Sequence, residues 1–565
     1  MCKTNMKATV AAAALAVAAA TFPGEARCAA ASGAGPAGVR PKLSDVSLSS
    51  SMPQYMHGDP TDGVRPELSG EQGFSVSVWR GETAYVKIPE RWQATASGLA
   101  GRRGAGYSLS LLRFDDVKYD LTESYKDKKG KTRTKVTGKG AVPDVCREWK
   151  PGDKGRPTML KIVVKPDAAP NVSLVEFGGG VFMLDVVNRV LPPPGEWKYF
   201  LDLWQHPWAV SRYFNVKPFS KEHYAKMEPV WRTLAENGCK ALTVTLLEKP
   251  WNGQCHDPYH SMVGRVKTAD GKWKFDYSLF DEYVEFGRKC GLGPDIACYS
   301  MCPWSYMCAW QDEDGKWQKV KAVPGTPEFE EYWGDFLVDF AQHLKDKGWF
   351  ADTYIAMDER GPKDVKNIAD FIQKKAPGMK IAMCGNRSPS EFEGITIDNY
   401  CQGLIHLKKH PKLLDELEPR RQKGFKTTFY VCCTAAHPNT FMDSPYYEGY
   451  WLGAYPAVIG FDGFLRWAAN SWPKDPYDDS SFKSNVWRPG DTYFVYPNGE
   501  LSPRMISLRN GVVAAEKLRI LREADVDVEK AGLYDVRKKY GYMGACANRF
   551  DFEDFYRDMQ KVVNR

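Results

Sequence analysis

The stretch TYIAMDERGPKDVKNIADFIQKK, residues 353–375, contains one complete unit of strand followed by helix. Residues 353–357 form a short apolar run with the length of a buried strand. A helix is expected from Pro362 to Lys375, after a polar connection that contains two adjacent carboxylates. Strands that alternate with helices in this way are typical of parallel α/β folds.

The same unit recurs along most of the chain. Strands are expected at 199–204, 240–247, 295–300, 353–357, 380–384, 395–401, 426–433 and 460–467. Helices are expected at 220–237, 277–290, 326–347, 362–375, near 389, and at 411–422, 446–455 and 503–522. Eight such pairs predict a TIM-like (β/α)8 barrel. A doubly wound open sheet is the alternative, but no glycine-rich phosphate loop follows the first strand.

The chain before the barrel has a different pattern. Short alternating runs such as FSVSVWR (74–80) and MLKIVVK (159–165) are separated by glycine, proline and polar clusters. They predict a β-sandwich over residues 40–195, which ends in the stiff linker LPPPG. The barrel is then expected over 196–525. Residues 526–565 are charged and show no clear periodicity, which predicts a tail packed on or beside the barrel.

The first thirty residues predict a signal peptide. Lys3 and Lys7 precede an apolar run that ends at Phe22, and small residues follow. Cleavage is expected between Cys28 and Ala31, so the protein is predicted to be exported, to the periplasm or beyond the cell. No later segment has the length of about 20 apolar residues that a membrane span needs.

Composition narrows the function classes. The 565 residues carry a net charge of +7, and the one dense basic run, 126–139, has no interleaved aromatic residues, so nucleic-acid binding is not expected. Aromatic residues make up 13% of the chain, and many lie beside glycine, proline, asparagine or histidine, which favours a site that stacks on sugars. The cysteines have no metal-like spacing, and most lie in apolar runs; neither a metal nor a cofactor is expected.

The active site of a (β/α)8 barrel lies at the carboxyl ends of its strands. The polar and aromatic residues expected there are Gln205, His206, Trp208, Lys249, Trp251, Asn252, Tyr299, Asp358, Glu359, Asn386, Gln402, Tyr430, His437, Trp467, Asn470 and Trp472. This set is rich in carboxylate, amide, indole and phenol groups and lacks a clustered histidine or cysteine triad. It favours a glycosidase over a serine or metal hydrolase.

Asp358 and Glu359 are the strongest catalytic candidates. Within a strand they would point to opposite faces, but at its end both carboxylates can reach the mouth of the barrel. Their proximity would raise one pKa and leave an acid beside a base. The alternative is that they stabilise the N-terminus of the helix that begins at Pro362.

Several longer motifs resemble glycoside hydrolase family 123, the β-N-acetylgalactosaminidases, and its wider bacterial relatives. The similarity covers roughly residues 74–522. The motifs are YIAMDERGP (354–362), LDLWQHPWAVSRY (201–213), KPWNGQCHDPY (249–259), GFLRWAANSW (463–472) and GDTYFVYPNGELSPRMISLRNG (490–511).

The resemblance implies a retaining exo-enzyme that removes terminal β-linked N-acetylgalactosamine through an oxazoline intermediate. Glu359 would be the general acid/base, and Asp358 would orient and polarise the 2-acetamido group of the substrate. Substrate-assisted families are exceptions to the scheme in which two protein carboxylates do the chemistry.

Six further residues are predicted to bind the sugar. Trp467 and Trp208 are expected as stacking platforms, Asn386 and Asn470 as hydroxyl binders, and Tyr430 as a donor to the acetamido oxygen, with His206 beside them. Each has a structural alternative: Trp467 as a packing residue, His206 bonded to a loop carbonyl, or Asn470 as a helix cap. Relatives often carry an acidic and a tyrosyl residue where this chain has Ala514 and Ala515, a departure that leaves the carboxylate pair untouched.

Two other functions stay open at this point. The first is a glycan-binding protein without catalysis, against which the retained Asp358 and Glu359 pair argues. The second is a glycosidase for a different sugar, because no single residue specifies an axial 4-hydroxyl group. In each case the partner is a glycan.

Overall fold

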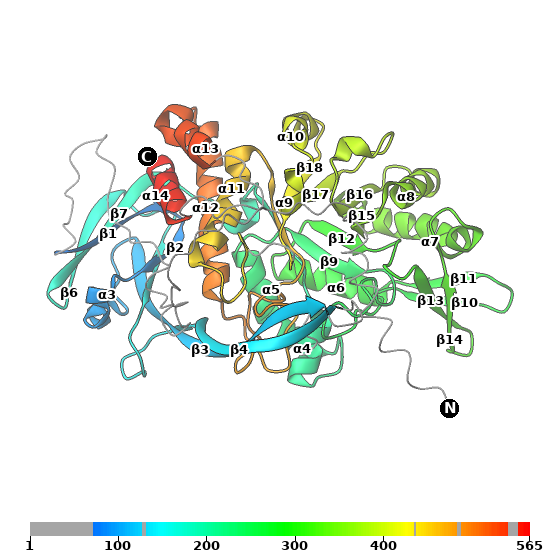
Figure 1. The fold of residues 1–565 in the computed structure, drawn as a ribbon, viewed down its shortest axis with the longest axis horizontal. Helices are drawn as coiled ribbons and strands as arrows, with labels where there is room; N and C mark the ends of the chain where they lie inside the picture. The colour runs from blue at the N-terminus through cyan, green and yellow to red at the C-terminus, as the bar shows by residue number, and fades with distance from the viewer. Residues whose placement is uncertain (1–71, 127–131, 434–436, 483–486, 541–551, 565) are drawn as a thin grey trace.

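The chain folds as a β-sandwich followed by a (β/α)8 barrel (Figure 1), as the sequence predicts. The structure, a computed structural model, describes residues 72–126, 132–433, 437–482, 487–540 and 552–564. The predicted signal peptide lies outside the described residues.

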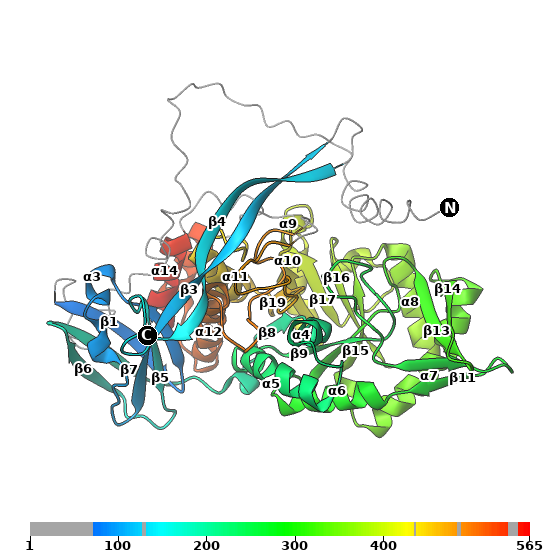
Figure 2. The same cartoon turned by 90° about the horizontal axis from the view of Figure 1, so that it is seen from below.

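The sandwich has two sheets with the strand orders β1-β7-β6 and β2-β5-β3-β4. Alternate residues such as Val76 and Val78 of β1 and Leu160 and Ile162 of β5 are buried in a common core. The strands are β1 (Gly73–Arg80), β2 (Thr83–Lys87), β3 (Tyr107–Lys126), β4 (Thr132–Glu148), β5 (Met159–Val164), β6 (Asn171–Phe177) and β7 (Gly180–Val190). Figure 2 shows the β3–β4 hairpin extending well beyond the other strands.

Eight parallel strands form the barrel in the order β8-β19-β18-β17-β16-β15-β12-β9. They are β8 (Phe200–Leu203), β9 (Ala241–Thr245), β12 (Asp295–Tyr299), β15 (Thr353–Asp358), β16 (Lys380–Gly385), β17 (Asn399–Gly403), β18 (Lys426–Tyr430) and β19 (Gly463–Arg466). The strand predicted at 395–401 is shorter at its start than expected, since β17 begins only at Asn399.

A side chain closes the seam between the first and second strands. One backbone bridge joins Leu201 to Cys239. The Gln205 amide nitrogen donates to the carbonyl oxygens of Leu203 and Ala241, the latter at 3.1 Å, and its amide oxygen accepts from the Thr243 N–H at 2.9 Å. Gln205, which the sequence places among the polar residues at the strand ends, is therefore part of the barrel framework.

The barrel helices are α4 (Pro207–Phe214), α5 (Lys221–Glu236), α6 (Ser278–Lys289), α7 (Pro327–Asp346), α8 (Pro362–Lys375), α9 (Leu404–Leu407), α10 (Leu413–Gln422), α11 (Tyr446–Ile459) and α12 (Pro503–Glu523). The helix expected near Pro389 is a single 3-10 turn, Pro389–Glu391. The connection between β16 and β17 is too short to run a full helix back along the barrel.

The loops after β9 and β12 contribute a second, four-stranded sheet that the sequence analysis did not predict. Its order is β11-β10-β13-β14, and its strands are β10 (Gly264–Lys267), β11 (Trp273–Asp276), β13 (Met307–Asp312) and β14 (Trp317–Lys321). These runs of four to six residues mix lysines and tryptophans, so they lack the apolar signal of the barrel strands.

The C-terminal segment is more regular than predicted. It contains α13 (Tyr534–Tyr540) and α14 (Phe552–Val563). Buried Phe555, Met559, Val562 and Val563 give α14 one apolar face, so the prediction that this segment lacks periodicity is wrong. In Figure 1, α14 lies beside α11 and α12, between the sandwich and the barrel.

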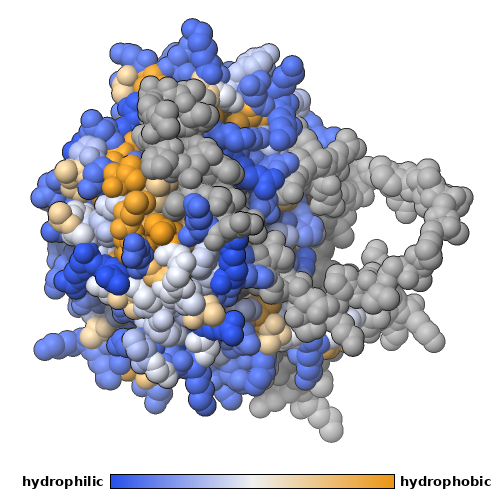
Figure 3. All heavy atoms as spheres, turned by 90° about the vertical axis from the view of Figure 1, so that its left-hand side faces the viewer, coloured by the Kyte–Doolittle hydropathy of each residue, from blue (hydrophilic) through white to orange (hydrophobic). Residues whose placement is uncertain are grey.

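The sandwich end of the molecule carries exposed apolar residues beside its polar ones (Figure 3). On β6, Val172 and Leu174 are exposed, while Val175 and Phe177 are buried. Among the residues that the structure describes, no helix is long and apolar enough to cross a bilayer.

Candidate active site

Asp358 and Glu359 lie where the central strand β15 ends. Residues Thr353 to Met357 are fully packed in the barrel, Asp358 is half-buried, and Glu359 is exposed at the mouth. Glu359 adopts a left-handed backbone with φ 48°, while its N–H donates to the Cys384 carbonyl at 2.9 Å. A left-handed non-glycine residue is costly and is a recurrent feature of active sites. The turn breaks the strand alternation that would have separated the two carboxylates.

The surroundings of Asp358 hold its proton tightly. Enclosure by the barrel and the adjacent Glu359 carboxylate raise the pKa of Asp358 well above its usual range. The Arg360 guanidinium and a hydrogen bond from the Trp304 side chain oppose that rise. The two adjacent acids therefore occupy different environments, one enclosed and one open to solvent.

Glu359 lies in one cluster with two predicted binding residues, Tyr430 and Asn386. The Tyr430 hydroxyl, at the end of β18, donates to the Glu359 carboxylate, and its oxygen lies 3.3 Å from the Asn386 amide oxygen, just past β16. Burial and the Glu359 charge raise the pKa of Tyr430 well above its usual range, so the phenol stays protonated and able to donate. The structure thus brings Glu359, Asn386 and Tyr430 together.

Glycine at position 403 leaves room beside this cluster. Gly403 ends β17, between the strands that carry Asn386 and Tyr430. A Cβ atom there would lie 3.1 Å from the Tyr430 hydroxyl and 3.2 Å from the Asn386 amide oxygen. Any larger residue would displace these polar groups or fill the space beside them.

Three packed aromatic rings follow or end the first three barrel strands, and one of them, Tyr299, interacts electrostatically with Asp358. Trp204 and Trp251 stack at 5.0 Å between ring centroids, and Tyr299 lies 4.5 Å from Trp204. Burial and the surrounding thiol and carboxylate groups, Asp358 among them, raise the pKa of Tyr299. All three residues are buried, so they support the site from within the barrel.

His206 and Trp208 follow β8, and the side chains of both are buried. Burial lowers the pKa of His206 to about 3, so the ring is neutral, although a hydrogen bond with the Trp467 backbone opposes the change. Trp208 packs edge-on against Tyr259 and Phe219 and is only 7% exposed. These contacts show that Trp208 has a packing role, while its role as a platform stays a prediction.

Asn470 also has a structural position. Its side-chain oxygen accepts from the His206 N–H at 2.8 Å, and its side-chain nitrogen donates to the His206 carbonyl at 3.1 Å. Asn470 is fully buried. Both polar ends are therefore used to fix the turn after β8, which gives no support to the predicted hydroxyl-binding role.

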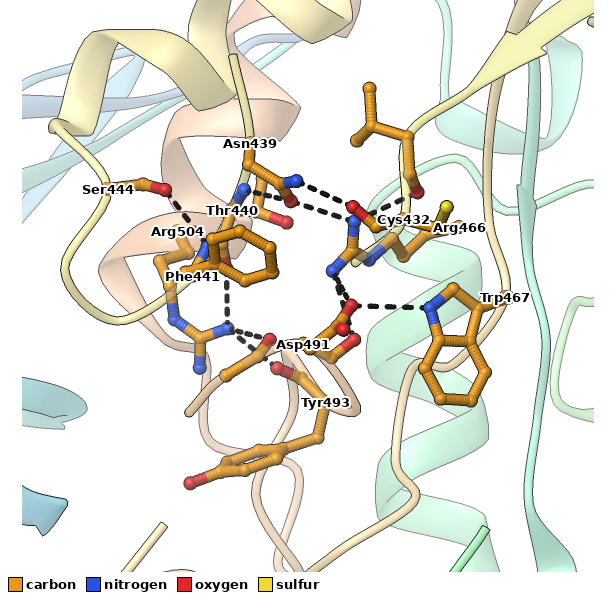
Figure 4. A network of polar contacts seen from close by, with 12 residues as sticks. Cys432, Asn439, Thr440, Phe441, Ser444, Arg466, Trp467, Asp491, Tyr493 and Arg504 are labelled. Carbon is orange, nitrogen blue, oxygen red and sulfur yellow. Dashed lines mark hydrogen bonds and ion pairs between the residues drawn. The ribbon is translucent and has the colours of Figure 1, made fainter. Parts of the chain in front are cut away.

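Trp467 directly follows β19 and belongs to a buried polar network (Figure 4). Its indole N–H donates to an Asp491 carboxylate oxygen at 3.3 Å, and its ring lies 5.1 Å from that of Trp487. It is 6% exposed, so a narrow part of its surface reaches solvent.

The sequence analysis missed three residues that contact the carboxylates or their immediate neighbours. Trp304, in the loop after β12, hydrogen-bonds to Asp358, and Cys432 interacts electrostatically with both Asp358 and Tyr430. Arg360 packs over the Tyr306 ring at 5.5 Å, and the Tyr306 hydroxyl donates to Asp364 at 2.8 Å. Arg360 and Cys432 lie within two residues of predicted residues, whereas Trp304 lies five residues beyond the end of β12, where position alone gives no signal.

The chemistry available is that of two carboxylates with hydrogen-bond donors. Within the described ranges, no three histidine, cysteine or acidic side chains form a cluster that could hold a metal ion. An exposed glutamate held by a phenol can exchange a proton with a bound molecule, while an enclosed aspartate can stabilise positive charge beside it.

One family model and one solved structure agree with this architecture. The family model of the glycoside hydrolase 123 catalytic domain matches residues 204–521. A family 123 glycoside hydrolase from Clostridium perfringens, studied for glycolipid glycan hydrolysis, aligns with 87% of this chain and 92% of its own, at 21% identity and a TM-score of 0.69. An exo-beta-1,4-mannosidase from Opitutaceae bacterium strain TAV5 aligns with 57% of this chain and 60% of its own, at 13% identity and a TM-score of 0.33. A search of curated proteins gave no match.

Proposed function

Because the chain belongs to glycoside hydrolase family 123, we propose that it is a retaining exo-β-N-acetylgalactosaminidase. Its substrates would be glycolipid or glycoprotein glycans that end in β-linked N-acetylgalactosamine. Family membership makes the protein a glycosidase; the sugar, the mechanism and export through residues 1–30 are the proposed part.

The contrast between Asp358 and Glu359 is the observation that carries the proposal. In this mechanism Glu359, at the mouth, donates a proton to the glycosidic oxygen as its bond to the anomeric carbon breaks. The acetamido oxygen of the same sugar attacks that carbon and forms an oxazoline. Water, deprotonated by Glu359, then opens the oxazoline with net retention.

Asp358 is placed for the complementary role. As the acetamido oxygen attacks, the amide nitrogen gains positive charge, which an adjacent carboxylate stabilises only near the transition state. The pKa of Asp358 is raised in the free protein, and Trp304 and Arg360 oppose that rise; the positive charge that develops on the amide nitrogen would further favour the ionised form that this role requires. Tyr430 donates to Glu359 in this structure, so donation to the acetamido oxygen, as predicted, would require that hydrogen bond to break.

A panel of aryl β-glycosides tests the proposal. Hydrolysis of the N-acetylgalactosaminide, with the N-acetylglucosaminide much slower and the simple galactoside inert, is the expected result, because the galactoside lacks the nucleophile. A thiazoline analogue of the oxazoline should inhibit strongly. Equal turnover of the galactoside would refute participation by the acetamido group, and binding without turnover of any member would favour a glycan-binding protein.

A further inference from the structure

Asp491 lies at the centre of the buried network beside the mouth of the barrel (Figure 4). The side chains of Asp491 and Arg466 are both inaccessible to solvent and form an ion pair. Arg466 also donates to the carbonyl oxygens of Asp491, at 3.1 Å, and Val431, at 3.0 Å, and to the Asn439 amide oxygen at 2.9 Å. One guanidinium therefore joins the segments that follow β18 and β19 to the loop around Asp491.

The two oxygens of the Asp491 carboxylate have different contacts. Its Oδ1 accepts both from Arg466 and from the Trp467 indole N–H, the latter at 3.3 Å. Its Oδ2 is buried and has no hydrogen-bond partner among the residues that the structure describes. If Asp491 served only to neutralise Arg466, a bidentate pair that uses both carboxylate oxygens would be more favourable. Because Arg466 and Trp467 instead share Oδ1, we infer that the carboxylate also orients the Trp467 ring.

We propose that Asp491 is a positioning residue that fixes the plane of the Trp467 indole at the mouth of the barrel. The Trp467 ring is held at one end by its own Cα–Cβ bond and at the other by the hydrogen bond from its N–H to Asp491. Trp487 packs against the same ring. Since Trp467 is 6% exposed, a small rotation decides whether its accessible part faces a sugar.

The consequence for catalysis rests on the proposed function. A ring that stacks on a sugar contributes to binding in the ground state and the transition state alike, so losing its orientation raises KM more than it lowers kcat. Asp491 touches neither Asp358 nor Glu359 in the described network, which separates its effect from loss of the acid.

The test uses Asp491→Asn, Trp467→Phe and the double variant, each in the full chain. Asp491→Asn should raise KM about tenfold and change kcat less than threefold, and it should add little in the Trp467→Phe background. Glu82→Gln is the matched control, because it breaks another buried ion pair, with Lys517 at 2.8 Å, in the interface between sandwich and barrel. It should lower stability without this change in KM.

A spectroscopic measurement keeps the test independent of the substrate. In protein labelled with 5-fluorotryptophan, the Trp467 resonance is assigned by its loss in Trp467→Phe, and Asp491→Asn should shift and broaden it while Glu82→Gln leaves it in place. If the wild type cleaves no hexosaminide, the proposed function fails while this shift still tests the positioning role.

A variant that removes both charges covers the case in which Asp491→Asn fails to fold. Asp491→Leu combined with Arg466→Met replaces the pair by apolar groups of similar volume, which buried pairs often tolerate. It should show the same fluorine shift and KM rise. An unshifted Trp467 resonance in a folded Asp491 variant, or additive KM effects in the double variant, would overturn the proposal.

Discussion

Two neighbouring acids, Asp358 and Glu359, differ because the backbone turns between them. The left-handed conformation at Glu359 lifts its side chain to the solvent-exposed mouth, where Tyr430 donates to it. Asp358 stays within the barrel, and burial together with the Glu359 charge raises its pKa. The proposed division into acid and electrostatic partner therefore rests on where each carboxyl group lies, one at the mouth and one within the barrel.

Glu359→Gln tests the role of the acid. Natural glycans have poor leaving groups that need protonation, so their hydrolysis should fall by a factor on the order of 10²–10⁴. Aryl glycosides with acidic leaving groups need little protonation and should retain part of their rate. Steady-state kinetics on both substrate types measure the difference, and equal losses on both would place the acid elsewhere.

Asp358→Asn tests the electrostatic role. The change is nearly isosteric and keeps a hydrogen-bonding group, so KM should change little, while kcat should fall by a factor on the order of 10²–10³. If Asp358 were a covalent nucleophile, a fluorosugar would trap a glycosyl adduct on the peptide that contains it. Mass spectrometry would detect that adduct, and its presence would refute the oxazoline mechanism.

Arg360→Met tests the electrostatic influence on Asp358. The Arg360 charge favours the ionised carboxylate, so its removal should raise the pKa of Asp358 further. Protonation would then begin at higher pH, and the acid limb of the pH profile of kcat/KM should move upward. Arg360→Lys keeps the charge and should move the limb less. An unmoved limb in Arg360→Met would show that Asp358 does not control it.

At the scale of elements, the barrel depends on one side chain where its first and second strands meet. Gln205→Met keeps the size of the side chain but leaves the Thr243 N–H without its acceptor inside the barrel. An unsatisfied buried group costs about 1–3 kcal/mol, so the free energy of unfolding should fall by at least that amount in denaturant titrations. Gln422→Met, exposed at the end of α10, is the control and should change it by less than about 0.5 kcal/mol.

Most barrel strands were predictable because they contain an apolar run buried on both faces, as KIAMC (380–384) does in β16. The start of β17, whose sequence NYCQG is more polar, was predicted less well. The inserted sheet was not predicted, since its short strands face solvent on one side. The periodicity of α14 was overlooked because lysines and acids surround its apolar positions.

The candidate site residues were likewise predictable only in part. Asp358, Glu359, Asn386 and Tyr430 were found by their place at the ends of strands, and the structure brings Glu359, Asn386 and Tyr430 into contact, with Asp358 next to Glu359. Asn470 was predicted from its position just past a strand end. That position fits a residue that contacts substrate and equally one that hydrogen-bonds to the His206 backbone. That distinction depends on tertiary contacts between segments more than 250 residues apart.

At the scale of the whole molecule, the sandwich contributes to the barrel's structure. Asp144, on β4, pairs with Arg504 in the first turn of α12, with N–O distances of 2.8 and 3.0 Å. Arg504 in turn donates to the carbonyl oxygens of Thr440, Gly490 and Tyr493, at 2.7 to 3.1 Å. The hairpin is therefore connected through one buried guanidinium to the loops around Asp491 and the mouth of the barrel.

Asp144→Asn should destabilise the whole protein, because it leaves the Arg504 charge buried without its partner. Breaking a buried pair in this way costs about 3–5 kcal/mol, which denaturant titration of the full chain would measure. The same hairpin offers a control in Lys118→Met, which removes an ion pair with Asp478 whose side chains are 71% and 64% exposed. Such a surface pair contributes about 0–1 kcal/mol, so Lys118→Met should be near neutral. Equal effects of the two substitutions would mean that the hairpin rests on the barrel without stabilising it.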